Sequence, residues 1–385
     1  MAPTPVPSSA ASSPARTDGS NPAAERADAP PPHAWRAADL ADDGRWVVAL
    51  DDDDVAQLER ALAVARATGK GMLALDPADF PLGDALRARL RDAVDRTQTG
   101  LGLAVMRGLP VGRWRVEDAR LAYWGLGLHV GVARTQGRAS HAMSDVRDEG
   151  LDYRGRDGRG YNTSAELDFH ADFCDLVGLL CLADAREGGD TVLVSSIAVH
   201  DHIAATRPDL LEVLYRPFGY SLQGAGAPGG PEWFPCPIFG VRDGRFACRC
   251  NRKNVIAAQQ RFADVPRLTP EQLEALDLLD ATIARPELRF TMRMRPGDLQ
   301  WLNNHVILHS RTAFVDHDDP ARRRHLLRLW LALPEGHALP EGWRPGYGAV
   351  TARTVRGGLR GSAIGPDFLD YERRLAAHHR MALAT

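Results

Sequence analysis

Apolar side chains in the front third of the chain recur at every third or fourth position between charged residues. The clearest stretches are residues 55–67, 85–93 and 116–126. This period places the apolar side chains along one face of an α-helix. We therefore predict three amphipathic helices in a helical and mixed N-terminal part that covers residues 36–160.

From residue 167 onward, short runs of β-branched, aromatic and leucine residues replace the helical spacing. Turn signals separate the runs, among them Asp243-Gly244, which predicts a hairpin. We expect a sheet-based core over residues 161–335, with strands at residues 177–182, 191–194, 238–241, 246–250, 288–294 and 326–333.

Two helices are predicted between these strands. One covers residues 208–215, and the other begins after Thr269, which is a favourable N-cap followed by Pro270 at the first helical position. Residues 336–385 form a C-terminal extension, so that residues 36–385 make a single catalytic domain. Residues 1–35 are rich in Ala, Pro and Ser and predict a disordered tail.

Composition narrows the class of function. Hydrophobic residues make up 44% of the chain and charged residues 25%, as in ordinary water-soluble globular proteins. The formal net charge of -3 gives no attraction for polyanions, so we expect no nucleic-acid partner. No run of about 18 uncharged apolar residues predicts a membrane-spanning helix. The expected partner is a small-molecule substrate, and the sequence leaves a homo-oligomer open.

The five cysteines are an odd and sparse set without a C-x-x-C pair, so they predict neither a disulfide framework nor a structural zinc site. Such a set fits a reducing compartment, and we expect a cytoplasmic protein. Cys248 and Cys250 alternate along a predicted strand. We interpret them as small apolar core residues.

His170 and Asp172 stand two residues apart in Leu167 to Phe173, a stretch that we predict to be a strand with both side chains on one face. With 13 His and 50 acidic residues in 385 positions, one or two H-x-D pairs arise by chance. The chain holds a second pair, His317 and Asp319, in a polar stretch that predicts a solvated loop. The pair at His170 therefore needs further support.

A third ligand is available at His309, which follows a Pro-Gly-Asp turn on a predicted returning strand. Two histidines and one carboxylate form a facial triad that leaves adjacent positions on iron(II) open. His305 is the rival for this place. We favour His309, because a histidine beside two asparagines more often serves as a hydrogen-bonded or surface residue.

Arg324 and Arg328 are spaced evenly on an apolar predicted strand, so both guanidinium groups leave the same face. Buried arginines need anionic partners, and a dicarboxylate would supply one. The alternative is a pair of structural salt bridges to Asp or Glu. Thr191 begins a strand after Gly188-Gly189-Asp190, from which its hydroxyl could reach the same carboxylate.

These motifs, in this order, resemble those of the taurine/2,4-dichlorophenoxyacetate dioxygenase (TauD/TfdA-like) family. The resemblance covers about residues 161–334 and rests on F-H-A-D, G-G-D-T, P-G-D, H-S-R and R-H-L-L-R, which begin at Phe169, Gly188, Pro296, His309 and Arg324. It implies a mainly β chain with flanking helices, folded as a double-stranded β-helix, a cupin-like jelly-roll. Its cofactors would be Fe(II), 2-oxoglutarate as co-substrate and O2.

Carried over residue by residue, the resemblance implies that His170, Asp172 and His309 hold the iron. It implies that Arg324 and Thr191 hold the distal carboxylate of 2-oxoglutarate. Arg328 matches a position that meets an anionic group of the prime substrate, or here supports the co-substrate.

The implied activity is hydroxylation of an unactivated C–H bond of a small anionic or amino-acid-like molecule, with release of succinate and CO2. Desaturation or cyclisation is open on the same ligand set. Two alternatives remain: a non-catalytic jelly-roll that binds a small molecule, and a zinc hydrolase that uses the same triad. Residues beside the motif strands are candidates for the substrate pocket, namely Tyr161, Asn162, Phe173, Trp301 and Asn303.

Overall fold

The computed structural model of the chain describes residues 31–153, 159–361 and 364–384. The expected tail over residues 1–30 lies outside the described residues. Residues 31–385 form one compact unit. Residues 31–35, which we had included in the tail, belong to this unit, because Trp35 is 2% exposed and its Nε1 donates to the Leu101 carbonyl at 2.8 Å.

The expectation of a mainly β chain is wrong, since 37% of the described residues are helical and 23% lie in strands. The α-helices are α2 (Asp52–Ala67), α3 (Asp84–Gln98), α4 (Val116–Val130), α5 (Ser196–Thr206), α6 (Pro208–Leu214), α7 (Arg252–Arg261), α8 (Pro270–Ile283), α9 (Arg344–Tyr347) and α10 (Pro366–His378). Among the described residues, no helix combines the length and apolar character needed to span a bilayer.

A mixed seven-stranded sheet, the major sheet, has the order β1-β2-β13-β5-β16-β3, with β4 also paired to β16. Only β1 and β2 run parallel within it. The strands are β1 (Val47–Ala49), β2 (Leu103–Arg107), β13 (Asp298–Asn303), β5 (Leu176–Ala183), β16 (His325–Ala332), β3 (Val132–Ala133) and β4 (Met143–Val146).

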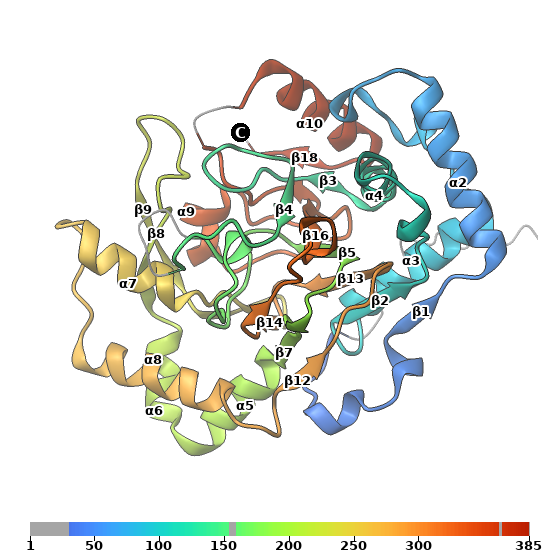
Figure 1. Cartoon of the computed structure of the whole chain (residues 1–385). Coiled ribbons are helices and arrows are strands. Elements are labelled where there is room, and N and C mark those ends of the chain that lie inside the picture. Colours follow the sequence, from blue (N-terminus) through green and yellow to red (C-terminus); the bar gives the residue numbers. More distant parts are fainter. Residues whose placement is uncertain (1–30, 154–158, 362–363, 385) are drawn as a thin grey trace, which may run out of the picture. The chain divides into compact units, whose positions relative to one another are not determined.

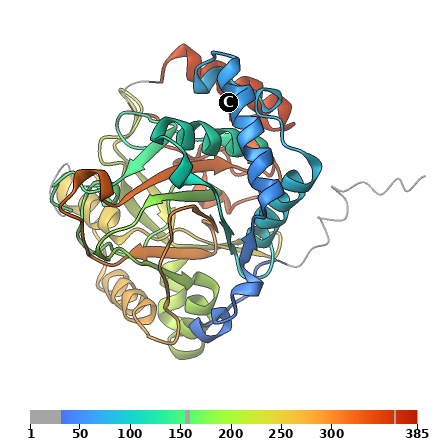
Figure 2. The ribbon, with the colours of Figure 1, turned by 45° about the vertical axis from the view of Figure 1, so that its right-hand side comes forward.

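The central strand β5 explains how this sheet is covered. Its sequence LVGLLCLA is apolar almost throughout, as expected for a strand that is covered on both faces. Leu176 and Leu180 pack into a core with the helices α2, α3, α4 and α10, whereas Val177 and Cys181 face a second core. Figure 2 shows helix α2, in blue, on the outer side of the strands.

A three-stranded sheet, the minor sheet, has the order β12-β7-β14 and is antiparallel throughout. Its strands are β12 (Phe290–Met292), β7 (Thr191–Ser195) and β14 (Ile307–Arg311). Leu193 and Ile307 share the second core with Val177 and Trp330 of the major sheet. Helices α5, α6 and α8 complete this core and gather beside β7 and β12 (Figure 1).

The remaining strands form short pairs. They are β6 (Glu187–Gly188) with β15 (Phe314–Val315), β8 (Pro217–Ser221) with β9 (Trp233–Pro237), β10 (Phe239–Arg242) with β11 (Arg245–Cys248), and β17 (Thr354–Val355) with β18 (Ala382–Leu383). The predicted hairpin at Asp243-Gly244 is confirmed: it joins β10 to β11 with φ of 51° and 72°. These positive values suit a two-residue turn that matches strand twist.

Local sequence signals account for several elements. Thr269 caps α8 by accepting a hydrogen bond from Gln272 N at 3.2 Å, as predicted. The three predicted N-terminal helices correspond to α2, α3 and α4, and residues 208–215 to α6. We did not predict α5 and α7. The segment from Leu167 to Phe173 is not a strand, which corrects our prediction, and it holds only single bridges to neighbouring segments.

Gly178 on β5 provides a test of packing on the helix-facing side of the major sheet. A Cβ at this position would lie 2.3 Å from the Trp301 ring and 2.3 Å from the Tyr123 hydroxyl. We expect Gly178→Ala to lower the free energy of unfolding by about 1–3 kcal/mol, because neither ring has room to retreat in a close-packed core. Urea unfolding followed by circular dichroism measures the change.

Gly71→Ala is the matched control, since its φ is -68° and nothing lies within 4 Å of the added Cβ. Its stability should stay within about 0.5 kcal/mol of the parent chain. Equal stability of the two variants would contradict the packing described here.

Candidate active site

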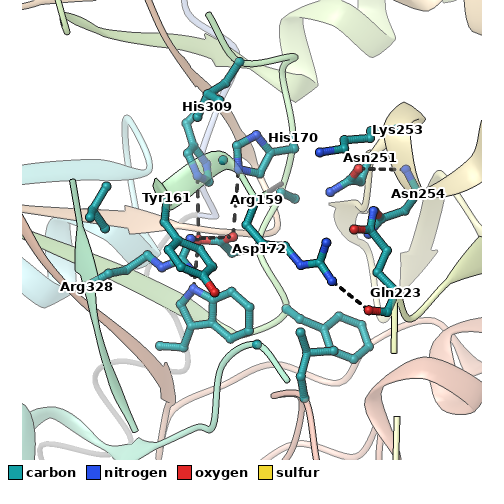
Figure 3. Close-up of a pocket in the computed structure, with 18 of the residues that line it drawn as sticks. Arg159, Tyr161, His170, Asp172, Gln223, Asn251, Lys253, Asn254, His309 and Arg328 are labelled. Atoms are coloured by element: carbon teal, nitrogen blue, oxygen red, sulfur yellow. Dashed lines mark hydrogen bonds and ion pairs between the residues drawn. The ribbon is translucent and has the colours of Figure 1, made fainter. Parts of the chain in front are cut away.

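His170, Asp172 and His309 converge inside the compact unit and form the candidate metal centre. Their ligand atoms all lie within 4.8 Å of one another, and Figure 3 shows the three side chains pointing toward a common point. Nε2 of His170 is 3.9 Å from Oδ1 of Asp172, and Nε2 of His309 is 3.7 Å from Oδ2. The three residues predicted from the sequence are therefore brought together.

Backbone pairing fixes the two histidines. His170 N donates to His309 O, and His309 N donates to His170 O, each at 3.0 Å. His309 lies on β14, so this reciprocal pair ties the segment before β5 to the minor sheet. Two further bonds hold the segment: Ala171 N donates to the Cys250 carbonyl at 2.8 Å, and Asp172 N donates to Asn304 Oδ1 at 2.8 Å.

The imidazole rings of His170 and His309 differ in the hydrogen bonding of their Nδ1 atoms. Nδ1 of His170 lies 2.9 Å from the carbonyl oxygen of Asp168, so a proton on Nδ1 leaves the Nε2 lone pair facing Asp172. His309 is buried, and its Nδ1 has no hydrogen-bond partner within the described part of the chain. Burial, followed by the proximity of His170, lowers the pKa of His309 to about 3. His309 is therefore neutral near pH 7, the form that binds metals.

Asp172 is a buried carboxylate with two side-chain donors beside it. Trp330 Nε1 donates to its Oδ2 at 2.8 Å, and Arg328 Nη1 lies 3.3 Å from both carboxylate oxygens. Burial raises the pKa of Asp172, but Arg328 and the two histidines outweigh this effect and the pKa is lowered. Asp172 is thus ionised and aimed at the histidines.

The geometry fits a divalent ion. First-row divalent ions form bonds of about 2.1 Å to nitrogen and oxygen, so two ligands of one ion lie no more than about 4.2 Å apart. The separations of 3.7 and 3.9 Å from Asp172 to the histidines fall within this limit, and the three ligand atoms all lie within 4.8 Å, so a small side-chain adjustment brings them onto one ion. Two imidazoles and one carboxylate on one side are the donor set of mononuclear iron(II) oxygenases.

Arg324 is a second unsatisfied group of the same cavity. It is 4% exposed, its Nη2 donates to Gly189 O at 3.4 Å, and its Nη1 has no partner among the residues that the structure describes. Burial lowers its pKa from the ordinary value. Thr191, at the start of β7, lines the same cavity. A buried guanidinium with a free donor requires an anion, and this position suits a carboxylate.

Arg328 already has hydrogen-bond partners within the protein. Besides its contact with Asp172, its Nε donates to Gln136 Oε1 at 2.8 Å, and its Cζ lies 5.5 Å from the centre of the Tyr161 ring. Both Arg324 and Arg328 line the cavity, although Arg324 precedes β16 and Arg328 lies within it. Both therefore reach the cavity as expected, although a register shift between His325 and Leu326 interrupts the regular alternation on which the prediction rested.

The cavity in front of these residues measures about 180 Å³. Of the expected substrate residues, Tyr161 and Phe173 line it. The sequence did not single out Arg159, Arg249, Lys253 and Arg311, which also line it. Arg311 had a signal, because it follows His309 by two positions on one strand. Arg249 lies in the strand predicted at residues 246–250 but stands outside the recognised motifs, and Arg159 and Lys253 lie outside every predicted helix and strand.

Three residues expected at the cavity wall lie elsewhere. Trp301 on β13 is buried in the core between the major sheet and its outer helices. Asn303 leaves the same face two residues later and donates from Nδ2 to the Thr97 carbonyl at 3.0 Å. Asn162 is buried and accepts a hydrogen bond from Arg159 N at 2.9 Å. Strand alternation, rather than proximity to the motifs in sequence, decides which side chains reach the cavity.

His305 has the hydrogen-bonded role that we favoured for it. Its Nε2 lies 2.9 Å from Asp175 Oδ1, which also accepts a hydrogen bond from Arg356 Nε at 2.8 Å. Burial lowers the pKa of His305, while Asp175 opposes this effect. His317 lies in the predicted loop and is not part of the candidate centre.

The family described as "Taurine catabolism dioxygenase TauD, TfdA family" matches residues 63–330 of the chain. FR-33289 synthase of Streptomyces rubellomurinus is 31% identical over 315 residues, which cover 80% of this chain and 91% of that protein. A taurine hydroxylase-like protein of Stachybotrys chartarum is 30% identical over 305 residues, 77% of each chain.

Among solved structures, asparagine oxygenase in complex with Fe(II), 2S,3S-3-hydroxyasparagine and succinate is similar with a TM-score of 0.56. The similarity covers 75% of this chain and 93% of that chain at 21% identity, and it shows a shared fold. That fold is the jelly-roll of these oxygenases, which this chain builds from a mixed sheet and helices without closing it. The chain therefore belongs to the TauD/TfdA family and is an iron(II)- and 2-oxoglutarate-dependent dioxygenase, an oxidoreductase.

Proposed function

We propose that this dioxygenase hydroxylates an unactivated C–H bond of a small anionic molecule, such as an amino-acid derivative. The charge of the cavity carries this proposal. Asp172 is the one acidic residue among the described lining residues, against six basic residues: Arg159, Arg249, Lys253, Arg311, Arg324 and Arg328. A divalent ion and the dianion 2-oxoglutarate cancel each other, so the positive excess remains for the prime substrate.

His170, Asp172 and His309 are the proposed iron ligands. Iron(II) held by these residues would, together with 2-oxoglutarate and O2, supply the oxidising power for the C–H bond, and 2-oxoglutarate would leave as succinate and CO2. The chain contributes positioning. Trp330 and Arg328 hold the Asp172 carboxylate toward the histidines, and the neutral state of His309 keeps a nitrogen lone pair available.

Arg324 and Thr191 are the proposed site for the distal carboxylate of 2-oxoglutarate. The unpartnered Nη1 of Arg324 supports this role, because a charged hydrogen bond would relieve its desolvation. Arg328 would then orient Asp172 and add positive charge to the cavity beside Tyr161.

Hydroxylation is favoured over desaturation or cyclisation, because the similar structure of asparagine oxygenase holds a hydroxylated amino acid, 3-hydroxyasparagine, together with succinate. That amino acid also carries a carboxylate, as our charge argument requires of the substrate. Tyr161 and Phe173 are the proposed apolar walls for the carbon skeleton.

The choice of His309 over His305 as a metal ligand is tested by substituting each of these two histidines in turn. We expect His309→Ala to abolish the visible charge-transfer absorption that forms when apoprotein is titrated anaerobically with iron(II) and 2-oxoglutarate. His305→Gln should retain the absorption, because His305 bonds to Asp175 rather than to the metal centre. Retention in the first variant or loss in a folded second variant would reverse the assignment of the two histidines.

The co-substrate assignment is tested at Arg324. Arg324→Met should raise the concentration of 2-oxoglutarate at half-maximal absorption about 10- to 100-fold, since hydrogen bonds to charged groups contribute about 1.5–3 kcal/mol. Arg323→Met is the matched control, because the neighbouring Arg323 is exposed. If both variants titrate like the parent protein, Arg324 does not bind the co-substrate.

The proposed activity is tested by a screen for substrate-stimulated succinate formation. Small carboxylates, sulfonates and amino-acid derivatives are compared with their uncharged amides or esters. We expect stimulation by at least one anion and none by its uncharged partner, because only the anion matches the basic cavity. Stimulation by uncharged compounds alone would rule out the proposed substrate class.

A further inference from the structure

We propose that Arg249 binds a terminal oxyanion of the prime substrate, at a subsite separate from that of 2-oxoglutarate. This inference rests on the proposed function and names the group that recognises the substrate. Arg249 lines the cavity and is 4% exposed. Its Nε and Nη1 are buried without a hydrogen-bond partner, and no acidic residue in the described part of the chain forms an ion pair with it.

A box of aromatic rings surrounds this guanidinium. Its Cζ lies 4.2 Å from the centre of the Phe173 ring, and the other three rings of the box lie 5.2 to 5.8 Å away: Tyr220, Phe234 and Tyr347. Aromatic faces stabilise the cation but accept none of its N–H groups in the manner of a carboxylate. The box therefore fixes Arg249 in place and leaves donors for an external anion.

Backbone pairing brings Arg249 close to the metal centre. Cys250 accepts a hydrogen bond from Ala171, and Asn251 forms a bridge with His170. Side chains alternate along extended backbone, so Arg249 and Asn251 leave the same face of this segment, and both line the cavity. The segment thus runs beside the metal ligands and presents its polar side chains to the substrate.

The surroundings of the subsite favour negative charge. Asn251 caps helix α7 by accepting a hydrogen bond from Asn254 N at 3.1 Å, so the helix begins at the cavity wall with its positive end. Figure 3 shows Asn251, Lys253, Asn254 and Gln223 on the side of the metal ligands away from Arg328. The anion would have polar partners besides Arg249.

Three other arginines that line the cavity already have partners or a proposed role. Arg328 is bonded to Asp172 and Gln136, Arg311 donates to the carbonyl oxygens of Gly160 and Ala165, and Arg324 serves 2-oxoglutarate in the proposed function. Arg249 is left with unused donors. We therefore expect a small substrate whose reacting carbon lies by the metal ligands and whose carboxylate, sulfonate or phosphonate meets Arg249.

The test uses simple oxyanions on the loaded protein. The protein is kept anaerobic with iron(II) and saturating 2-oxoglutarate, so that Arg324 is already occupied, and is titrated calorimetrically at low ionic strength with acetate, methanesulfonate or methylphosphonate. The three probes distinguish the kinds of oxyanion. We expect at least one to bind the parent protein, and Arg249→Met to weaken that binding about tenfold or more.

Arg242→Met is the matched control, because Arg242 lies on the same hairpin and bonds to Leu339 O and Glu341 instead. It should bind the probe like the parent protein. Arg249→Lys keeps the charge and should bind the probe more tightly than Arg249→Met, which guards against a variant that fails to fold. Equal binding by the parent protein and Arg249→Met, or no binding of any probe to the parent protein, overturns the inference.

The iron(II) charge-transfer absorption separates this inference from the proposed function. Retained absorption with lost probe binding in Arg249→Met supports a substrate subsite at Arg249. Absence of the absorption in the parent protein would instead refute the proposed metal and co-substrate sites.

Discussion

The reciprocal backbone bonds between His170 and His309 are the constraint on which the site depends. They join a segment outside regular structure to β14 of the minor sheet, while the same segment continues directly into β5 of the major sheet. The two histidines and Asp172 are therefore fixed relative to both sheets at once. Because packed sheets resist small displacements, the ligand atoms are held near one another before any ion binds.

Burial of charge is the second constraint. A carboxylate such as Asp172 is costly to bury alone, and the structure offsets that cost with Arg328 and Trp330. Arg324 and Arg249 have no such compensation among the described residues. Burying a guanidinium group without a partner costs free energy, so we expect these two arginines to bind an anion. Anionic reactants would supply that partner, which also explains why both arginines line a single cavity.

The sequence predicted the cluster of candidate ligands better than the fold around it. Motif order pointed to three residues that the structure brings together. Arg324 and Arg328 both line the cavity, although a register shift between His325 and Leu326 interrupts the alternation on which their prediction rested. The strand predicted around His170 was wrong, since isolated bridges carry no periodic signal. Trp301 was misassigned for a related reason: residues beside a motif reach the cavity only if the pleat directs them there. Arg249 gave no signal, because its role depends on rings far away in sequence.

The elements that form the cavity wall explain which properties can be transferred to this chain from its family. The proposed metal ligand His309 and the proposed co-substrate residue Thr191 come from sheet strands, whose positions cannot change without moving the whole core. Much of the remaining cavity wall comes from segments outside the two main sheets, at residues 159–161, 221–225 and 249–254. Such segments can change while the sheets persist. The type of reaction therefore follows from the shared fold and motifs, whereas substrate choice has to be argued from side chains such as Arg249.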